Sequence, residues 1–254
     1  MTLWALRLEY DGLTFVGWQR QATGLSVQEV LETAASRLAR GAPVASIVAG
    51  RTDAGVHAEA QVAQITLPEG YSADRVRDAL NFHMKPHPVT VVKAAAAVDG
   101  WNARFSAIRR SYRYRILNRR ARPALALGRV WHVHHPLDHT AMHAAAQSLL
   151  GRHDFTSFRA SSCQAKSPLR TLDRLDVTRD GDVIEFVVEA RSFLHHQVRN
   201  MAGTLRLVGE GHWPVERVAV ALEARNRGAA GPTAPAEGLC LIAVGYPQDP
   251  FAGD

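Results

Sequence analysis

Three side chains capable of chemistry lie close together in the segment GRTDAGVHAEAQ, residues 50–61. Arg51 supplies a cation, Asp53 a carboxylate and His57 an imidazole, and flanking glycines permit tight turns around them. A carboxylate in such a setting can act as a nucleophile, a general base or a metal ligand. An isolated Asp in a glycine-flanked loop is more often a turn residue that hydrogen-bonds its own backbone, so this pattern alone does not assign Asp53.

The metal-ligand interpretation rests on His57-Ala58-Glu59, which matches the H-x-E half of the zinc site of nucleobase deaminases. That site also needs a P-C-x-x-C pair, and the only cysteines, Cys163 and Cys240, have neither this spacing nor the proline. The other histidines do not have zinc-ligand spacing, so we expect no bound metal. P-loop, G-x-G-x-x-G and G-x-S-x-G segments are also missing, which argues against a nucleotide cofactor or a serine nucleophile.

The segment with Asp53 lies between two predicted strands, residues 45–49 and 61–67, so we expect a loop with rigid flanks. Hydrophobic periodicity predicts the other elements of the first half. These are strands over residues 3–10 and 89–97, a helix from Val27 to Leu38 behind a capping box of Ser26 and Glu29, and a helix over residues 72–83.

From residue 111 a similar order of elements starts again. The longest predicted helix, residues 192–209, has Ser192 as its cap and a buried stripe that includes Leu194 and Val198. The remaining expected elements are strands over residues 111–117 and 238–246, a helix over 138–151, a hairpin over 175–190 around Asp180-Gly181, and a loop-like insertion over 227–238.

Strands and helices mix in both halves without the regular spacing of parallel βαβ units, which favours an α+β fold with antiparallel sheets. A chain of 254 residues suits one large domain or two small ones. We expect two halves, residues 1–104 with the Asp53 loop and residues 105–254.

The chain is basic, with a net charge of +6 and a sequence pI near 9.8. This favours a polyanionic partner such as nucleic acid, although a merely soluble basic protein is an equally simple interpretation. Two cysteines far apart in sequence fit a reducing cytosol. Arg7 and Glu9 interrupt what would be the apolar part of a signal peptide, and no apolar run is long enough to cross a bilayer.

Six blocks point to one family of enzymes. They are EYDGLTFVGWQRQ, GRTDAGVHA, ARFSAIRRSYRYRILN, DFTSFRASSCQAKSPLRTL, FLHHQVRNMAGTL and AEGLCLIAVGYP. In this order, from Leu8 to Pro247, they resemble the tRNA pseudouridine synthase A family, whose signature GRTDAGVHA matches. Glu59 departs from the small residues that follow the histidine in the family, which affects the local charge but not the match to Asp53.

The resemblance implies an isomerase that converts uridine to pseudouridine at positions 38, 39 and 40 of the tRNA anticodon stem-loop. The C1′–N1 glycosidic bond breaks and the base rejoins the ribose through C5, so neither a second substrate nor a cofactor is required. Asp53 would be the catalytic carboxylate, either as a nucleophile that forms a covalent adduct or as a base that removes the ribose 2′ proton. The implied fold has two α/β halves whose antiparallel sheets join into one extended sheet, with helices on one side and the active-site cleft between the halves.

The same resemblance implies the other site residues. Arg199 would pair with Asp53 and keep it ionised, on a helix that also carries His195 and His196. Tyr112 would stack on the flipped uracil with its hydroxyl near C5, although core packing is the usual outcome on such an alternating strand. The residues expected to contact RNA are Tyr112, Arg51, Arg109, Arg110, Arg113, His195 and His196.

The resemblance also implies a cytoplasmic homodimer that binds one tRNA across both subunits. Two alternatives belong to other classes: a tRNA-binding module without catalytic activity, and a zinc-dependent base-modifying hydrolase. The combination of Asp53, Tyr112 and Arg199 argues for the synthase.

Overall fold

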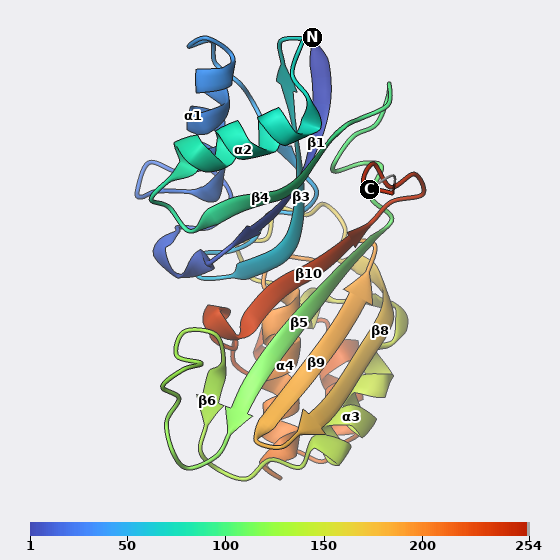
Figure 1. Cartoon of the computed structure of the whole chain (residues 1–254). Coiled ribbons are helices and arrows are strands. Elements are labelled where there is room, and N and C mark those ends of the chain that lie inside the picture. The colour runs from blue at the N-terminus through green and yellow to red at the C-terminus, as the bar shows by residue number, and fades with distance from the viewer. Residues whose placement is uncertain (253–254) are drawn as a thin grey trace. The chain divides into compact units, whose positions relative to one another are not determined.

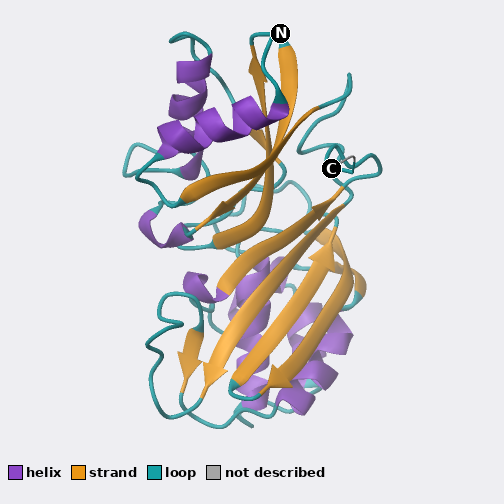
Figure 2. Cartoon of the chain, in the orientation of Figure 1, coloured by secondary structure: helices purple, strands orange, loops and turns teal. Residues whose placement is uncertain are grey.

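The computed structural model describes residues 1–252 and has the α+β fold that the sequence predicts (Figure 1, Figure 2). Within these residues the α-helices are α1 Val27–Leu38, α2 Ala73–Met84, α3 His139–Ala146, α4 Gln197–Gly209 and α5 Arg217–Glu223. The strands are β1 Thr2–Tyr10, β2 Ile47–Val48, β3 His57–Leu67, β4 Val89–Ala96, β5 Arg109–Asn118, β6 Trp131–Val133, β7 Gly151–Asp154, β8 Leu169–Asp180, β9 Val183–Ala190 and β10 Leu239–Gly245. None of the helices in this range is long and apolar enough to cross a membrane.

The ten strands belong to one mixed sheet. Hydrogen bonds connect eight of them in the order β4-β1-β3-β10-β5-β9-β8-β7, while β2 pairs with β3 and β6 with β5. The pairs β1–β3, β1–β4, β2–β3, β7–β8 and β8–β9 are antiparallel, as expected. The short β6 instead runs parallel to β5, which makes the sheet mixed.

The chain forms two compact units. The first comprises Met1–Arg110 and the closing residues from Leu241, and the second comprises Ser111–Cys240. The division expected from the sequence, after residue 104, assigned the closing strand to the second half, whereas these units place most of β10 with the first.

In the first unit, α1 and α2 cover one face of the β4-β1-β3 sheet (Figure 1). The cap of α1 is as predicted, because the Ser26 hydroxyl accepts a hydrogen bond from the Glu29 amide. Ala5 of β1 packs in a cluster with Trp101, Ala103 and Phe251. Since Ala5 and its neighbour Leu6 point to opposite faces and both are buried, this part of β1 is buried on both faces.

The loop that carries Asp53 is shorter than the sequence indicates. The strand expected over residues 45–49 is reduced to β2, in which Ile47 is exposed rather than buried. The strand expected to begin at residue 61 begins at His57, because Tyr10 of β1 already pairs with Ala58. His57 and Glu59 therefore lie on β3 and not in the loop.

In the second unit, the β8–β9 hairpin and β5 form a sheet with helices on one face. Ile184, Phe186 and Val188 of β9 are buried, and the residues between them are half-exposed. Figure 1 shows α3 and α4 behind β8 and β9, so the buried side chains lie between sheet and helices. This strict alternation is why the hairpin was predictable from sequence. The short elements α5, β6 and β7 were not expected, because each is too brief to show a period.

The longest helix begins later than predicted. A helix capped by Ser192 is wrong: α4 begins at Gln197, and His196 before it has a positive φ of 61°. A residue in this left-handed conformation cannot belong to a right-handed helix. The Gln197 side chain accepts a hydrogen bond from the Leu194 amide at 2.9 Å, which stabilises the turn before the helix. His195 and His196 therefore lie in a loop rather than on the helix.

Residues 227–238, expected as a loop-like insertion, pack against α4. The Gly231 amide donates to the Thr204 hydroxyl at 2.9 Å. Gly203 allows a still closer approach, because a Cβ at this position would overlap the carbonyl oxygen of Pro232. These contacts place residues 231–234 directly against α4.

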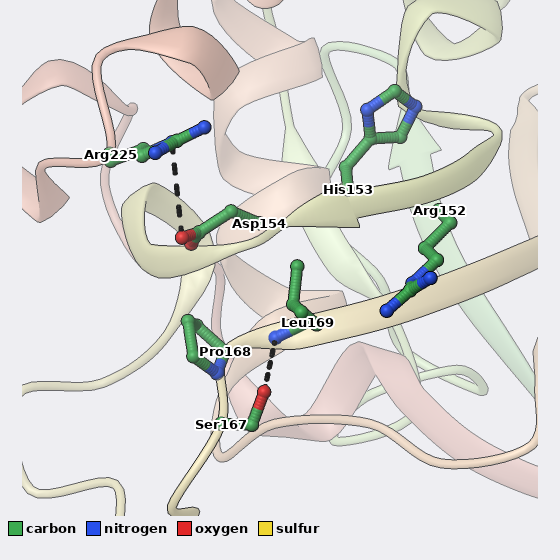
Figure 3. Close-up of a pocket in the computed structure, with 7 residues that line it drawn as sticks. All are labelled: Arg152, His153, Asp154, Ser167, Pro168, Leu169 and Arg225. Atoms are coloured by element: carbon green, nitrogen blue, oxygen red, sulfur yellow. Dashed lines mark hydrogen bonds and ion pairs between the residues drawn. The ribbon is translucent and has the colours of Figure 1, made fainter.

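An open hollow lies beside β7, the last strand on the path through the sheet (Figure 3). It is lined by Arg152, His153, Asp154, Ser167, Pro168, Leu169 and Arg225, none of which the sequence analysis assigns to the catalytic site. Asp154 lies 3.9 Å from the Arg225 guanidinium and accepts a hydrogen bond from the Thr156 amide at 2.9 Å.

These contacts determine the charge of Asp154. Partial burial raises its pKa, but the hydrogen bonds from Thr156 and the nearby Arg225 and Arg159 outweigh burial, so the net pKa lies below the ordinary 3.8. A carboxylate with a lowered folded-state pKa stabilises the folded protein above its unfolded pKa. That contribution is lost as the pH falls through the folded value.

We therefore expect Asp154→Asn to lower the free energy of unfolding at pH 7, and to have a progressively smaller effect below about pH 4. Asn keeps an acceptor for the Thr156 amide, so the variant mainly removes charge. Urea unfolding at several pH values measures this difference, and Asp173→Asn, at an exposed position of β8, controls for loss of a surface charge. An effect of equal size at every pH would contradict the role of the ionised carboxylate.

Candidate functional site

Asp53 lies in a loop, residues 49–56, that neighbouring segments of the first unit hold in place. The Thr52 carbonyl accepts a hydrogen bond from the Trp18 amide at 3.0 Å, and Asp53 forms an isolated β-bridge with Gly17. Gly17 has a φ of +108°, and a Cβ there would lie 2.7 Å from the Thr52 carbonyl oxygen. Only glycine permits this approach, so the chain around Gly17 holds the backbone of Asp53.

Two polar residues inside the sheet brace the same loop. The side-chain amide of Gln61, which is fully buried, donates to the Gly50 carbonyl at 2.8 Å and to the Tyr10 hydroxyl at 3.2 Å. Since the Tyr10 oxygen accepts from Gln61, its own proton is available for the Thr52 hydroxyl, 2.8 Å away. A buried network whose members are all satisfied favours a single loop conformation.

His57 directly follows the loop and holds its C-terminal end in place. Its Nδ1 accepts a hydrogen bond from the Gly12 amide at 3.1 Å, and Gly12 packs so closely that a Cβ would overlap the Val56 carbonyl oxygen. The Asp11 carboxylate lies 3.2 Å from the same nitrogen. His57 is thus a buried residue that helps to hold the loop in place.

Arg110, expected to contact RNA, is buried with 7% of its surface exposed. Its guanidinium donates to the carbonyl oxygens of Ala107 at 3.1 Å, Ala49 at 2.6 Å and Arg104 at 2.8 Å. Ala49 is the first residue of the Asp53 loop. These contacts make Arg110 a scaffold of the first unit, and we leave it out of the set proposed to bind RNA.

Charged side chains surround the tip of the loop. Asp53 is partly exposed and Arg51 is exposed, so both can reach a ligand. Glu59 is exposed on β3, six residues from Asp53, and gives this surface a second carboxylate. The first unit therefore presents the Asp53 carboxylate on a hydrogen-bonded loop close in sequence to the exposed Arg51 cation, which suits catalysis on a phosphate-bearing substrate.

Tyr112, in the second unit, lies on β5 with 8% of its surface exposed. It shares a face with Tyr114 and Ile116, and its ring meets the Phe193 ring edge-on with centroids 5.3 Å apart. Tyr114 is fully buried and donates to the Pro235 carbonyl at 2.9 Å. Burial and the nearby Glu237 raise the pKa of Tyr114, so it remains protonated and belongs to the core.

Arg199 lies in the first turn of α4, next to the loop of residues 227–238. Its Nε donates to the Ala234 carbonyl at 2.8 Å, and the Ala234 amide donates back to the Arg199 carbonyl at 3.1 Å. This reciprocal pair fixes the direction of the guanidinium group. Arg199 is only half-buried, which separates it from the core-facing stripe of the helix as the sequence predicts.

His195 and His196 lie in the loop before α4, with ring centroids 4.0 Å apart. The His195 carbonyl accepts a hydrogen bond from the Ala160 amide at 2.9 Å. Phe193, in the same loop, touches Tyr112. The second unit therefore gathers Tyr112, the two histidines and Arg199 around the start of α4.

The other arginines expected to contact RNA differ in their surroundings. Arg109 is exposed at the start of β5, whereas Arg113 lies 3.5 Å from the Glu185 carboxylate and is only 17% exposed in its side chain. Arg115 shares that carboxylate at 3.1 Å. Glu185 therefore offsets much of the positive charge on this part of the sheet.

The sequence pattern did not indicate the residues that hold the Asp53 loop, above all Tyr10, Gln61 and Gly17. Gln61 gave a signal that could have been used: it is a large polar residue in the interior of a strongly apolar strand. A polar side chain at such a position must find partners within the fold. The identity of those partners depended on pairing β1 with β3, which the sequence alone did not provide.

The bracing network leads to a testable expectation. Tyr10→Phe removes the hydroxyl between Gln61 and Thr52, and should lower the free energy of unfolding by about 1 kcal/mol. It should also speed amide hydrogen exchange in residues 49–56, measured by mass spectrometry. Tyr71→Phe is a matched control, because its hydroxyl donates to the Leu38 carbonyl away from this loop. If both variants lose stability but exchange in the loop is unchanged in Tyr10→Phe, the network does not hold the loop.

Comparisons with known proteins show which family this chain is similar to. The family model described as tRNA pseudouridine synthase matches residues 145–247. Over 252 residues the chain is 71% identical to the tRNA pseudouridine synthase A of Acidiphilium cryptum (strain JF-5), covering 99% of each chain. It is 58% identical over 250 residues to that of Gluconobacter oxydans (strain 621H), covering 98% of this chain and 91% of the relative. With near-complete coverage at this level of identity, the chain belongs to the tRNA pseudouridine synthase A family.

Proposed function

We propose that the protein is a tRNA pseudouridine synthase that isomerises uridine at positions 38, 39 and 40 of the anticodon stem-loop. Membership of the family and the six sequence blocks support this activity. The observation that carries the proposal is the placement of Asp53 on a loop that hydrogen bonds from Trp18, Gln61 and Tyr10 hold in place. A reacting carboxylate needs such a fixed position, because small displacements cost large factors in rate.

Asp53 would begin the reaction in one of two ways. As a nucleophile it bonds to C1′ while the C1′–N1 bond breaks; as a base it removes the 2′ proton as the same bond breaks. The freed uracil turns and C5 bonds to C1′. In the first route the Asp53–C1′ bond breaks as this happens, and in the second the proton returns from Asp53 to C2′. N1 gains a proton. The proton on C5 is then lost, so the product has the same atoms as the substrate and no cofactor is consumed.

Arg199 and Tyr112 would complete the chemistry. We assign Arg199 to stabilising the ionised form of Asp53, since a cation beside a carboxylate favours the charged state. The Ala234 contact supports this role by fixing the guanidinium of Arg199. Tyr112 would stack against the uracil, and its hydroxyl would accept the C5 proton. The edge-on contact with Phe193 supports the assignment by fixing the Tyr112 ring.

For RNA binding we propose Arg51, Arg109, Arg113, His195 and His196, with Tyr112 on the target base. The exposure of Arg51, Arg109 and His195 supports contact with phosphates. The paired Arg113 would contribute less, because Glu185 competes for its guanidinium. We further propose that the enzyme works in the cytoplasm as a homodimer, as the family resemblance implies.

Asp53→Asn tests the proposal. It keeps the size of the side chain and removes its charge, so pseudouridine formation in unmodified tRNA should fall to background. Affinity for tRNA should stay within about tenfold, or roughly 1.4 kcal/mol. Glu69→Gln, at an exposed carboxylate of the same unit, is the control. Pseudouridine formed by pure Asp53→Asn would overturn the assignment, and unmodified tRNA after incubation with the wild-type protein would overturn the function itself.

Substitutions of Tyr112 separate stacking from proton transfer. If the hydroxyl takes the C5 proton, Tyr112→Phe should bind tRNA normally but fail to release tritium from C5-labelled tRNA. If the ring only stacks, Tyr112→Phe should work nearly as well as wild type and Tyr112→Ala should lose affinity, by about 1–3 kcal/mol. We expect the first result. Tyr114→Phe loses a hydroxyl two residues away in the core and controls for the general effect on stability.

A further inference from the structure

Phe105 exposes 73% of its surface, although it is one of the largest apolar side chains in the protein. The Arg104 guanidinium lies 5.5 Å from the centroid of its ring, and Arg109 is exposed a few residues further on. An exposed aromatic ring among cations is the arrangement by which RNA-binding proteins stack bases and hold phosphates. Single exposed apolar residues are common, but this ring stands on a loop that hydrogen bonds hold in place.

The loop that carries Phe105 is held by bonds on both sides of the ring. The Asn102 side chain accepts hydrogen bonds from the amides of Arg104 at 2.9 Å and Phe105 at 3.0 Å. The Ala103 carbonyl accepts from the Tyr246 hydroxyl at 2.7 Å, and the Ala103 amide donates to the Gln64 side chain at 2.6 Å. The backbone under the exposed ring is therefore already ordered, which lowers the entropy lost when a ligand binds.

The same loop is joined to the loop of Asp53. A single nitrogen, Nη2 of Arg110, donates to the Arg104 carbonyl at 2.8 Å and to the Ala49 carbonyl at 2.6 Å. Phe105 directly follows Arg104, and Asp53 follows Ala49 by four residues. Both loops belong to the first unit, so the exposed ring is anchored beside the catalytic loop.

We propose that Phe105 is a stacking platform for an unpaired nucleobase of the substrate RNA, with Arg104 and Arg109 at the adjoining phosphates. This rests on the proposed function and extends it, since it assigns a contact outside the target uridine. Arg110 is then a positioning residue that sets the platform relative to Asp53. The cations favour a nucleic acid over an apolar protein surface as the occupant of this site.

The test compares four variants with unmodified tRNA as substrate. Phe105→Ala should raise the Kd and KM for tRNA roughly 5- to 150-fold, the range expected for one stacked base, with kcat unchanged. Phe105→Trp should restore affinity, while Phe105→Leu, which is apolar but has no ring, should not. Phe82→Ala is the matched control, because Phe82 is 68% exposed on α2 and lies edge-on to His83.

Salt dependence adds an independent readout. Phe105→Ala should leave the slope of log Kd against log salt unchanged, because stacking releases no counterion. Arg104→Ala should reduce this slope by about one phosphate contact. Equal tRNA affinity of Phe105→Ala and wild type, or full affinity in Phe105→Leu, would overturn the proposal.

Two further outcomes are distinguishable. A change of oligomeric state in Phe105→Ala by analytical ultracentrifugation, with unchanged tRNA affinity, would show a second copy of the chain as the occupant and overturn the proposal. If the wild-type protein made no pseudouridine, the proposed function would fail, but tRNA binding by Phe105→Ala would still test the platform.

Discussion

The buried guanidinium of Arg110 is the contact on which the first unit depends most. A cation removed from water costs several kcal/mol unless its donors find acceptors, and here three backbone carbonyls accept from it. These carbonyls belong to separate segments, so one side chain sets the start of the Asp53 loop relative to the loop of Phe105. An apolar side chain of similar size could fill the space, but it has no N–H donors with which to hold both segments.

The other hydrogen bonds around the Asp53 loop also hold its backbone in place. Gln61 and Tyr10 hold the Gly50 and Thr52 side of the loop, while Gly12 and His57 hold its end. Every one of these groups is buried or nearly so, and a buried polar group left unpaired is destabilising. The loop can therefore expose its carboxylate while its backbone stays in one conformation.

In the second unit, a backbone conformation and a close packing contact position Arg199. His196 adopts a left-handed conformation that ends the preceding loop and lets α4 begin with Gln197. The loop of residues 227–238 then packs on α4, because Gly203 leaves room for the Pro232 carbonyl, and it binds the Arg199 side chain through Ala234. The left-handed conformation of His196 and the absence of a side chain at Gly203 thus determine where the Arg199 guanidinium lies.

The sequence by itself determined the α+β class, the long helices and strands, and the residue types capable of chemistry. Periodic burial and the Ser26 cap are local properties, so they can be read without the fold. Only the tertiary structure decided that β3 begins at His57, that α4 begins after His196, and that Arg110 is a buried scaffold. The reason is physical: these features depend on partners distant in sequence, such as Tyr10 for Ala58 and Ala49 for Arg110, and hydrogen bonds between distant segments leave no period in the chain.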